Sequence, residues 1–215
     1  MATSEEIGKQ LAEKTRRELA QLKAQKASAT GAETRDWHHP EGYKFLAPWT
    51  NAVLLRFLVR TLTATLPRAE YRGKAQTDDA ARSVVANIEE GYKRATTKDY
   101  LNFLGYSQGS LEEVKGDIRR YCQDGFLKSR PDSGLADLGI NLKEIKGLLE
   151  ESKGETSLGL LHPSLESLKG TELTLEMFLE LINKTDWLLR RLVQSLEKKQ
   201  QQDEENEKMK IMGYR

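Results

Sequence analysis

The chain has 215 residues, enough for one domain with a sizeable hydrophobic core, with or without extensions. Hydrophobic residues make up only 38% and charged residues 31%, which is typical of a helical domain with solvated outer faces. The net charge of +1 gives no general attraction for polyanions, Cys122 alone excludes an internal disulfide, and no apolar run approaches the roughly 18 residues of a membrane-spanning helix. We therefore expect a cytoplasmic protein without a membrane anchor.

Residues 1–47 are predicted to form an N-terminal extension and a linker. Thr3 and Glu6 have the spacing of a capping box. A thin apolar stripe follows, formed by Ile7, Leu11, Leu19 and Leu22. A helix of this kind is marginal in water and needs a surface on which to dock.

Residues 48–128 are predicted to hold the first three helices of the domain. The first runs from about Pro48 to Leu66, because proline suits the first helical turn and Pro67 stops the helix. Its apolar residues recur at spacings of three and four: Val53, Leu54, Phe57, Leu58, Leu62 and Leu66. We expect Trp49, near its start, and Trp187, on the last helix, to lie in the core.

The second helix is predicted to begin at Thr77 or Asp78, which are both good N-caps. Its apolar face consists of Ala81, Val84, Val85 and Ile88. Gly91 is expected to end or loosen it, because glycine readily adopts the left-handed conformation found at helix ends.

The third helix is predicted to be capped by Thr96 or Thr97 and to end at about Asp124, before Gly125. Glycine inside a helix costs about 1 kcal/mol relative to alanine. We expect a close approach of another helix to compensate for this cost at a strip of small residues, namely Gly105, Ser107, Gly109 and Ser110.

The remaining sequence is predicted to contain a loop-rich insert at 129–172, with a short helix at 142–151, and a fourth helix at 173–200. The polar tail at 201–215 is either a fraying helix end or a disordered segment. No alternating strand pattern appears. The predicted fold class is therefore all-α, an antiparallel up-down-up-down four-helix bundle with an N-terminal helical extension and a long insert before the last helix.

Charge is unevenly distributed along the chain. Residues 44–98 carry ten basic and five acidic side chains, whereas 129–172 carry five basic and eight acidic ones. The candidate contacts with nucleic-acid phosphates are Arg56, Arg60, Arg82, Lys93, Arg94 and Lys98. Tyr92 and Tyr100 are candidates for stacking on unpaired bases. The alternative is an ordinary solvated face with salt bridges.

Ordinary catalytic and metal-binding patterns are absent from the sequence. His38, His39 and His162 have no further ligands at a spacing that suits a metal ion. Cys122 has no histidine near it in sequence, which favours an inert thiol. We expect no cofactor and no enzymatic activity.

A pattern of polar, apolar and glycine residues extends over the second and third helices. Its residues are Ser83, Asn87, Ile88, Glu90, Gly91, Arg94, Thr96 or Thr97, Gly109, Ser110, Leu111 and Glu113. Asn87, Glu90 and Arg94 share one helical face, where a capped helix end and a salt bridge are the simplest interpretation. The segment from Thr77 to Ile118 resembles the four-helix-bundle family encoded in intervening sequences of bacterial large-subunit ribosomal RNA.

The pattern is similar also to the accessory variability determinant of diversity-generating retroelements, a pentameric partner of a reverse transcriptase that binds nucleic acid. These resemblances imply a homo-oligomer, a pentamer in particular, and an accessory protein that binds RNA or DNA. They imply a protein partner such as a reverse transcriptase. The alternative is a protein-interaction scaffold that uses the acidic insert at 129–172 and binds no nucleic acid.

Overall fold

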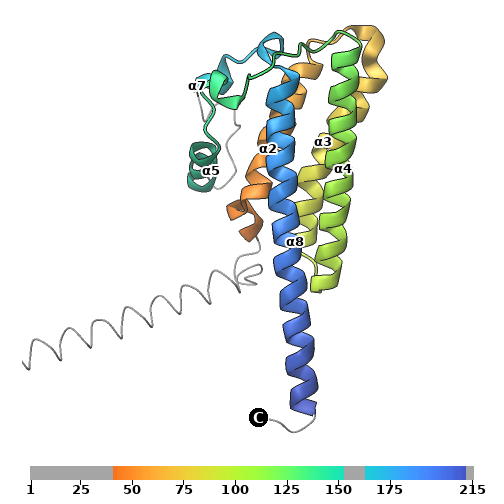
Figure 1. The fold of residues 1–215 in the computed structure, drawn as a ribbon, viewed down its shortest axis with the longest axis vertical. Helices are drawn as coiled ribbons and strands as arrows, with labels where there is room; N and C mark the ends of the chain where they lie inside the picture. Colours follow the sequence, from red (N-terminus) through yellow and green to blue (C-terminus); the bar gives the residue numbers. More distant parts are fainter. Residues whose placement is uncertain (1–40, 153–162, 212–215) are drawn as a thin grey trace, which may run out of the picture. The chain divides into compact units, whose positions relative to one another are not determined.

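The computed structural model describes residues 41–152 and 163–211, and these ranges are entirely helical apart from turns, loops and one isolated bridge. The predicted all-α class is therefore confirmed for them (Figure 1). In chain order the elements are η1 (Gly42–Phe45), α2 (Ala47–Thr63), η2 (Arg68–Glu70), α3 (Tyr71–Tyr92), α4 (Thr97–Gln123), η3 (Leu135–Leu138), α5 (Leu142–Glu151), α7 (Pro163–Glu166), η4 (Gly170–Glu172) and α8 (Leu175–Ile211).

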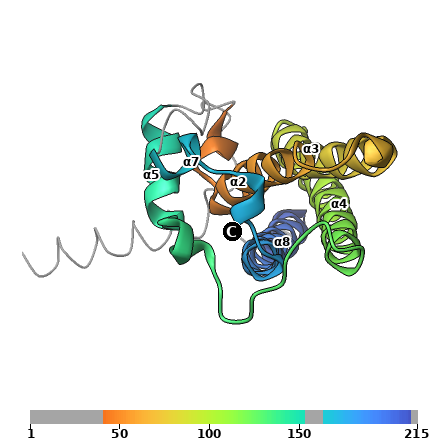
Figure 2. The ribbon, with the colours of Figure 1, turned by 90° about the horizontal axis from the view of Figure 1, so that it is seen from above.

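Four long helices enclose the core. Helix α2 contacts α3 and α8, and α4 contacts the same two helices (Figure 2). Each helix contributes side chains that are fully buried, among them Leu54, Leu58, Ile88, Leu104, Ile118, Phe178 and Ile182. Each large apolar side chain buried in this way contributes about 1.5–3 kcal/mol relative to an exposed one.

Helix α3 begins at Tyr71, six residues earlier than predicted, and Thr77 is not a cap. Thr77 is fully buried, and its hydroxyl oxygen lies 2.8 Å from Asp117 Oδ2 and 2.9 Å from the Tyr121 hydroxyl. The sequence pattern suggested a cap because threonine and aspartate favour helix starts, but here a tertiary contact with α4 uses the threonine hydroxyl.

The prediction that Gly91 ends or loosens the second helix is wrong, because Gly91 lies inside the last turn of α3 and has no positive φ. A Cβ added there would lie 2.7 Å from Phe103 Cβ and 2.8 Å from Tyr100 Cδ2. Glycine is therefore needed because α4 passes against the backbone of α3, not because the helix ends.

The ends of α4 follow the prediction. Thr96 caps the helix by accepting a hydrogen bond from Asp99 N at 3.0 Å, and Gly125 follows the helix with φ +80°. The predicted close approach at its small residues holds only in part. Ser107 is buried and donates its hydroxyl to the Val84 carbonyl of α3 at 2.9 Å, whereas a Cβ at Gly105 or Gly109 would meet nothing within 4 Å.

The insert packs on the long helices. Its predicted short helix is present as α5, which contacts α2 and η1. Its buried side chains include Leu135, Ile140, Ile145 and Leu149. Gly170 lies so close to α2 that an added Cβ would be 2.5 Å from the Thr61 carbonyl oxygen. The described part of the insert is thus a layer of the fold.

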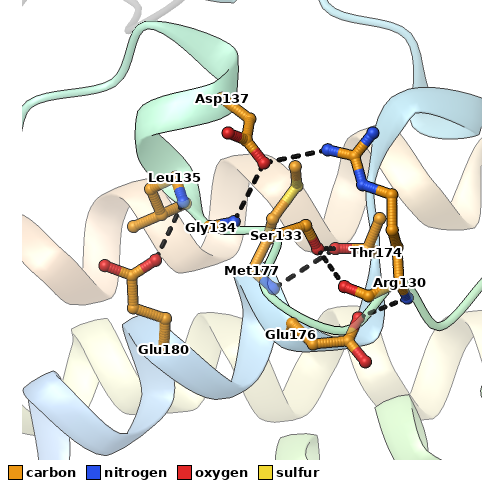
Figure 3. Close-up of polar contacts among 9 residues, drawn as sticks. All are labelled: Arg130, Ser133, Gly134, Leu135, Asp137, Thr174, Glu176, Met177 and Glu180. Atoms are coloured by element: carbon orange, nitrogen blue, oxygen red, sulfur yellow. Dashed lines mark hydrogen bonds and ion pairs between the residues drawn. The ribbon is translucent and has the colours of Figure 1, made fainter.

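Polar contacts tie the loop at 128–137 to the start of α8, and we call this set of contacts the α8 clasp (Figure 3). The Glu176 carboxylate accepts hydrogen bonds from the Ser129 hydroxyl and from Arg130 N. The Glu180 carboxylate accepts one from Leu135 N at 2.8 Å. Burial alone would raise the pKa of both carboxyls, but these hydrogen bonds, with Lys184 at Glu180, outweigh it and lower both pKa values.

Helix α8 runs for 37 residues, to Ile211, so the polar segment from 201 to 211 continues the helix. The prediction that Trp187 lies in the core is wrong, because its side chain is 55% exposed. Thr185 takes the buried position instead, donating its hydroxyl to the Leu181 carbonyl. Trp49 is buried, as predicted.

The substitution Gly91→Ala should destabilise the fold by about 1–3 kcal/mol, because the new methyl group overpacks the contact between α3 and α4. Gly147→Ala is the matched control, at a position of α5 where a Cβ meets nothing within 4 Å, and should stabilise by up to about 1 kcal/mol. Urea unfolding of both variants measures the two effects. Equal effects of the same sign would contradict the close approach at Gly91.

Acidification should weaken the α8 clasp. Because the folded-state pKa values of Glu176 and Glu180 are lowered, their contribution to stability is present above the ordinary carboxylate range and is lost as the pH falls through the lowered values. The melting temperature should therefore decrease as the pH is lowered below about 4.5, and the decrease should be less steep in the Glu180→Gln variant. Asp203→Asn, an exposed change near the far end of α8, should keep the wild-type dependence. A wild-type pH profile in Glu180→Gln would refute the contribution of Glu180.

Candidate nucleic-acid interface

Two hydrogen bonds fix the position of α2 along α3. Trp49 Nε1 donates to Glu89 Oε1 at 2.9 Å, near the start of α2. The Thr63 hydroxyl donates to Asp78 Oδ1, also at 2.9 Å, at the end of α2. Since the earlier residue of α2 pairs with the later residue of α3, these two helices run in opposite directions.

This register brings four of the predicted phosphate contacts together. On α2, Arg56 lies seven residues from both Trp49 and Thr63 and therefore on the same face, and Arg60 follows one turn later. On α3, Arg82 is one turn after Asp78, and Lys93, the C-cap residue of α3, is one turn after Glu89. We call Arg56, Arg60, Arg82 and Lys93, which border the line where α2 meets α3, the basic seam.

The basic seam is open to solvent. Arg60, Arg82 and Lys93 are exposed and Arg56 is half-buried. Within the described residues, the seam has one ion pair, between Arg82 and Asp79 at 3.4 Å, and both of those side chains are exposed. An exposed pair of this kind contributes less than about 1 kcal/mol, so it does not prevent Arg82 from contacting a phosphate.

The seam also has a defined length. Arg82 on α3 and Lys93, the C-cap residue of α3, are eleven residues apart, which corresponds to about 16 Å along the helix axis at the usual rise per residue. Arg56 and Arg60 lie opposite the Arg82 end of this stretch, because Thr63 is level with Asp78. A row of cations this long is able to follow several consecutive phosphates of an extended strand.

The predicted basic corner of Lys93, Arg94 and Lys98 is only partly available. Arg94 forms an ion pair with Glu90, and its guanidinium carbon lies 4.5 Å from the centre of the Phe103 ring. Lys93 Nζ lies 5.4 Å from the centre of the Tyr43 ring and is still exposed, as is Lys98. Arg94 thus has a structural role within the chain, and Lys98 lies beyond the seam on α4.

Tyr92 and Tyr100 do not offer rings to nucleic acid. They are 7% and 0% exposed and pack edge to face against each other, and Tyr92 packs against Tyr43 in the same way. Burial, together with the nearby carboxylates of Glu89 and Glu41, raises the pKa of Tyr43 to about 12. Tyr43 is therefore neutral under Lys93 at physiological pH. The prediction of base stacking by Tyr92 and Tyr100 is wrong.

Most of the recurring sequence pattern has a structural explanation. Ile88 and Leu111 are buried, and Glu90 forms the predicted salt bridge with Arg94. Glu113 accepts a hydrogen bond from Gln76 on α3 at 3.2 Å. Ser83, Asn87 and Ser110 are half-buried. Gly109 is exposed, and no described contact accounts for it.

Sequence reasoning missed a pocket between α2, α5 and α8 of about 200 Å³. It is lined by Ala47, Thr50, Asn51, Leu142, Lys143, Lys146, Lys184, Trp187 and Leu188. One signal was present in the sequence, since Trp187 falls five residues after Ile182 and two before Leu189, away from the apolar stripe of the last helix. The contribution of α5 could not be predicted, because it depends on how the insert folds back.

The residues considered for metal binding and catalysis give no site in the described part of the chain. No group of three or more His, Cys, Asp or Glu side chains there is placed to hold a metal ion. His38, His39 and His162 lie outside the described residues. Cys122 is a half-buried free thiol. No helix among the described residues is long and apolar enough to cross a membrane.

The described residues form an all-helical fold, and the sequence pattern from Ser83 to Glu113 spans the junction of α3 and α4. The chain belongs to the 23S rRNA-intervening sequence protein family, whose family model matches residues 44–150, from η1 to α5. The resemblance to this family is thereby confirmed, whereas the similarity to the retroelement accessory determinant stays a prediction. No curated protein and no solved structure matches the chain.

Proposed function

We propose that the protein is a non-enzymatic, cytoplasmic accessory factor that associates with RNA through the basic seam. The seam carries this proposal, because it places four cations along one edge, where the described residues form a single ion pair with them, the exposed one between Arg82 and Asp79. The family name supports RNA as the nucleic acid. Contacts of this kind bind phosphates without reading sequence and weaken steeply as salt rises.

The scaffold for this seam is, in our proposal, an antiparallel four-helix bundle of α2, α3, α4 and α8. Each of these helices contacts two of the others, which is the arrangement of a closed bundle. The hydrogen bonds from Trp49 to Glu89 and from Thr63 to Asp78 support opposite directions for the first pair. A rigid bundle holds the seam cations at fixed spacing and so lowers the entropy lost on binding.

We further propose that the bundle assembles as a homo-oligomer, with a pentamer as the specific expectation from the retroelement resemblance. Gly105 and Gly109 support this assembly, because they leave an open surface on α4 where a helix of another copy is able to approach. Tyr106 lies between them and is 61% exposed. A ring would place several copies of the seam around one axis and raise the affinity for a long RNA by multivalency.

A protein partner is the second candidate function, with the insert at 129–172 as its contact surface or, from the resemblance, with a reverse transcriptase as the partner. The insert keeps exposed acidic side chains such as Asp132 and Asp137 while it packs on the bundle. An oligomer that ignores nucleic acid at every salt concentration would favour this alternative.

The double substitution Arg56→Gln and Arg60→Gln should weaken binding to a short single-stranded RNA about tenfold or more at low salt, because two charge-assisted phosphate contacts are lost. Fluorescence anisotropy measures the affinity. The matched control is Arg119→Gln with Arg190→Gln, which removes the same charge from exposed positions on α4 and α8. Equal losses in both double variants would show attraction by net charge alone and would refute the seam.

The substitution Gly109→Gln should reduce the oligomer mass measured by light scattering, because a long side chain then occupies the open surface of α4. Gly147→Gln on α5 is the control, since a Cβ there also meets nothing within 4 Å. A mass unchanged in Gly109→Gln would remove this surface from the proposed interface, and a monomeric wild type would refute the oligomer.

A further inference from the structure

We propose that the pocket between α2, α5 and α8 binds one unpaired nucleobase together with its phosphate. This inference rests on the proposed association with RNA and adds a second, separate contact. Thr50 and Arg56 are six residues apart on α2 and therefore lie on different faces of the helix, so the pocket is not part of the basic seam. The pocket volume of 200 Å³ suits a single flat ring system and not a helix.

The walls of the pocket are suited to an aromatic ligand. Leu142, Leu188 and Ala47 supply apolar surface, and Trp187 supplies an indole that is 55% exposed. The guanidinium carbon of Arg191 lies 4.8 Å from the centre of the Trp187 ring and holds the indole in place. An exposed tryptophan at the rim of an apolar pocket is a platform for base stacking, because every base has a π-face.

One buried polar side chain of the pocket lacks a partner. Thr50 is 1% exposed, and its hydroxyl oxygen is buried without a hydrogen bond. Asn51 is 4% exposed and lines the same pocket. Leaving a buried polar group unsatisfied costs about 1–3 kcal/mol, so a ligand that pairs with the Thr50 hydroxyl recovers that cost. The edge of a nucleobase offers both donors and acceptors to a hydroxyl and an amide.

The charge around the pocket favours an anion. Three lysines line it, namely Lys143, Lys146 and Lys184. Lys146 pairs with Glu150 and Lys184 pairs with Glu180, whereas Lys143 has no ion pair among the described residues. Lys143 is thus available to a phosphate attached to the bound base, whereas the charge of each of the other two lysines is offset by its paired carboxylate. An aliphatic ligand without charge would leave both the lysine and the buried polar groups unused.

Anisotropy titrations of a labelled single-stranded oligonucleotide and of a labelled duplex RNA test the proposal, with the full chain and the variants Trp187→Ala and Thr50→Val. Trp187→Ala should weaken single-strand binding about 5- to 150-fold, the range for loss of one stacked base, and leave duplex binding unchanged. Thr50→Val keeps the shape of the side chain and should weaken single-strand binding in the same selective way. Circular dichroism melting verifies that both variants are folded.

The outcomes separate this inference from the proposed function. Equal losses for single strand and duplex, or no loss in Trp187→Ala, would overturn the base pocket and leave the seam standing. Loss of single-strand binding in Trp187→Ala without any effect of Arg56→Gln and Arg60→Gln would overturn the seam and keep the pocket. Absence of all RNA binding would overturn both the pocket and the seam.

Discussion

The hydrogen bonds that Trp49 and Thr63 donate to Glu89 and Asp78 hold α2 and α3 in one register along their whole contact. With this register, Arg56 and Arg60 border the same line as Arg82 and Lys93. A shift of α3 by one turn along α2 would move the two pairs about 5 Å relative to each other. The acceptors of both bonds are carboxylates, and among the described residues neither Glu89 nor Asp78 forms an ion pair with a cation of the seam.

The contact between α3 and α4 also stabilises the end of α3 that lies beside the start of α2. Gly91 allows Tyr100 and Phe103 to approach the backbone of α3, and Tyr92 and Tyr43 continue the aromatic cluster toward the start of α2. The cluster positions the turn between α3 and α4, and Lys93 lies over the Tyr43 ring at its edge. Tyr92 and Tyr100, which the sequence suggested for base stacking, are therefore buried in the cluster beside which Lys93 is exposed.

The sequence was sufficient for the helices and insufficient for their surfaces. Periodicity located each long helix that the structure describes and its apolar face, because a stripe at spacings of three and four must be buried whatever its partner is. It could not show that Thr77 bonds across to Asp117, or that Gly91 serves a close approach, because the same residue types also mark helix ends. Four of the six predicted phosphate contacts lie on the seam, but the pocket needed the insert, whose path over α2 no local pattern specifies.

The dependence of RNA affinity on salt tests the central claim most directly. If the four seam side chains contact phosphates of a single strand, a plot of the logarithm of the binding constant against the logarithm of salt concentration should fall with a slope of about −3 per bound subunit. Removing Arg56 and Arg60 should reduce that slope to about half. A slope near zero, or a slope that the double variant leaves unchanged, would contradict the account.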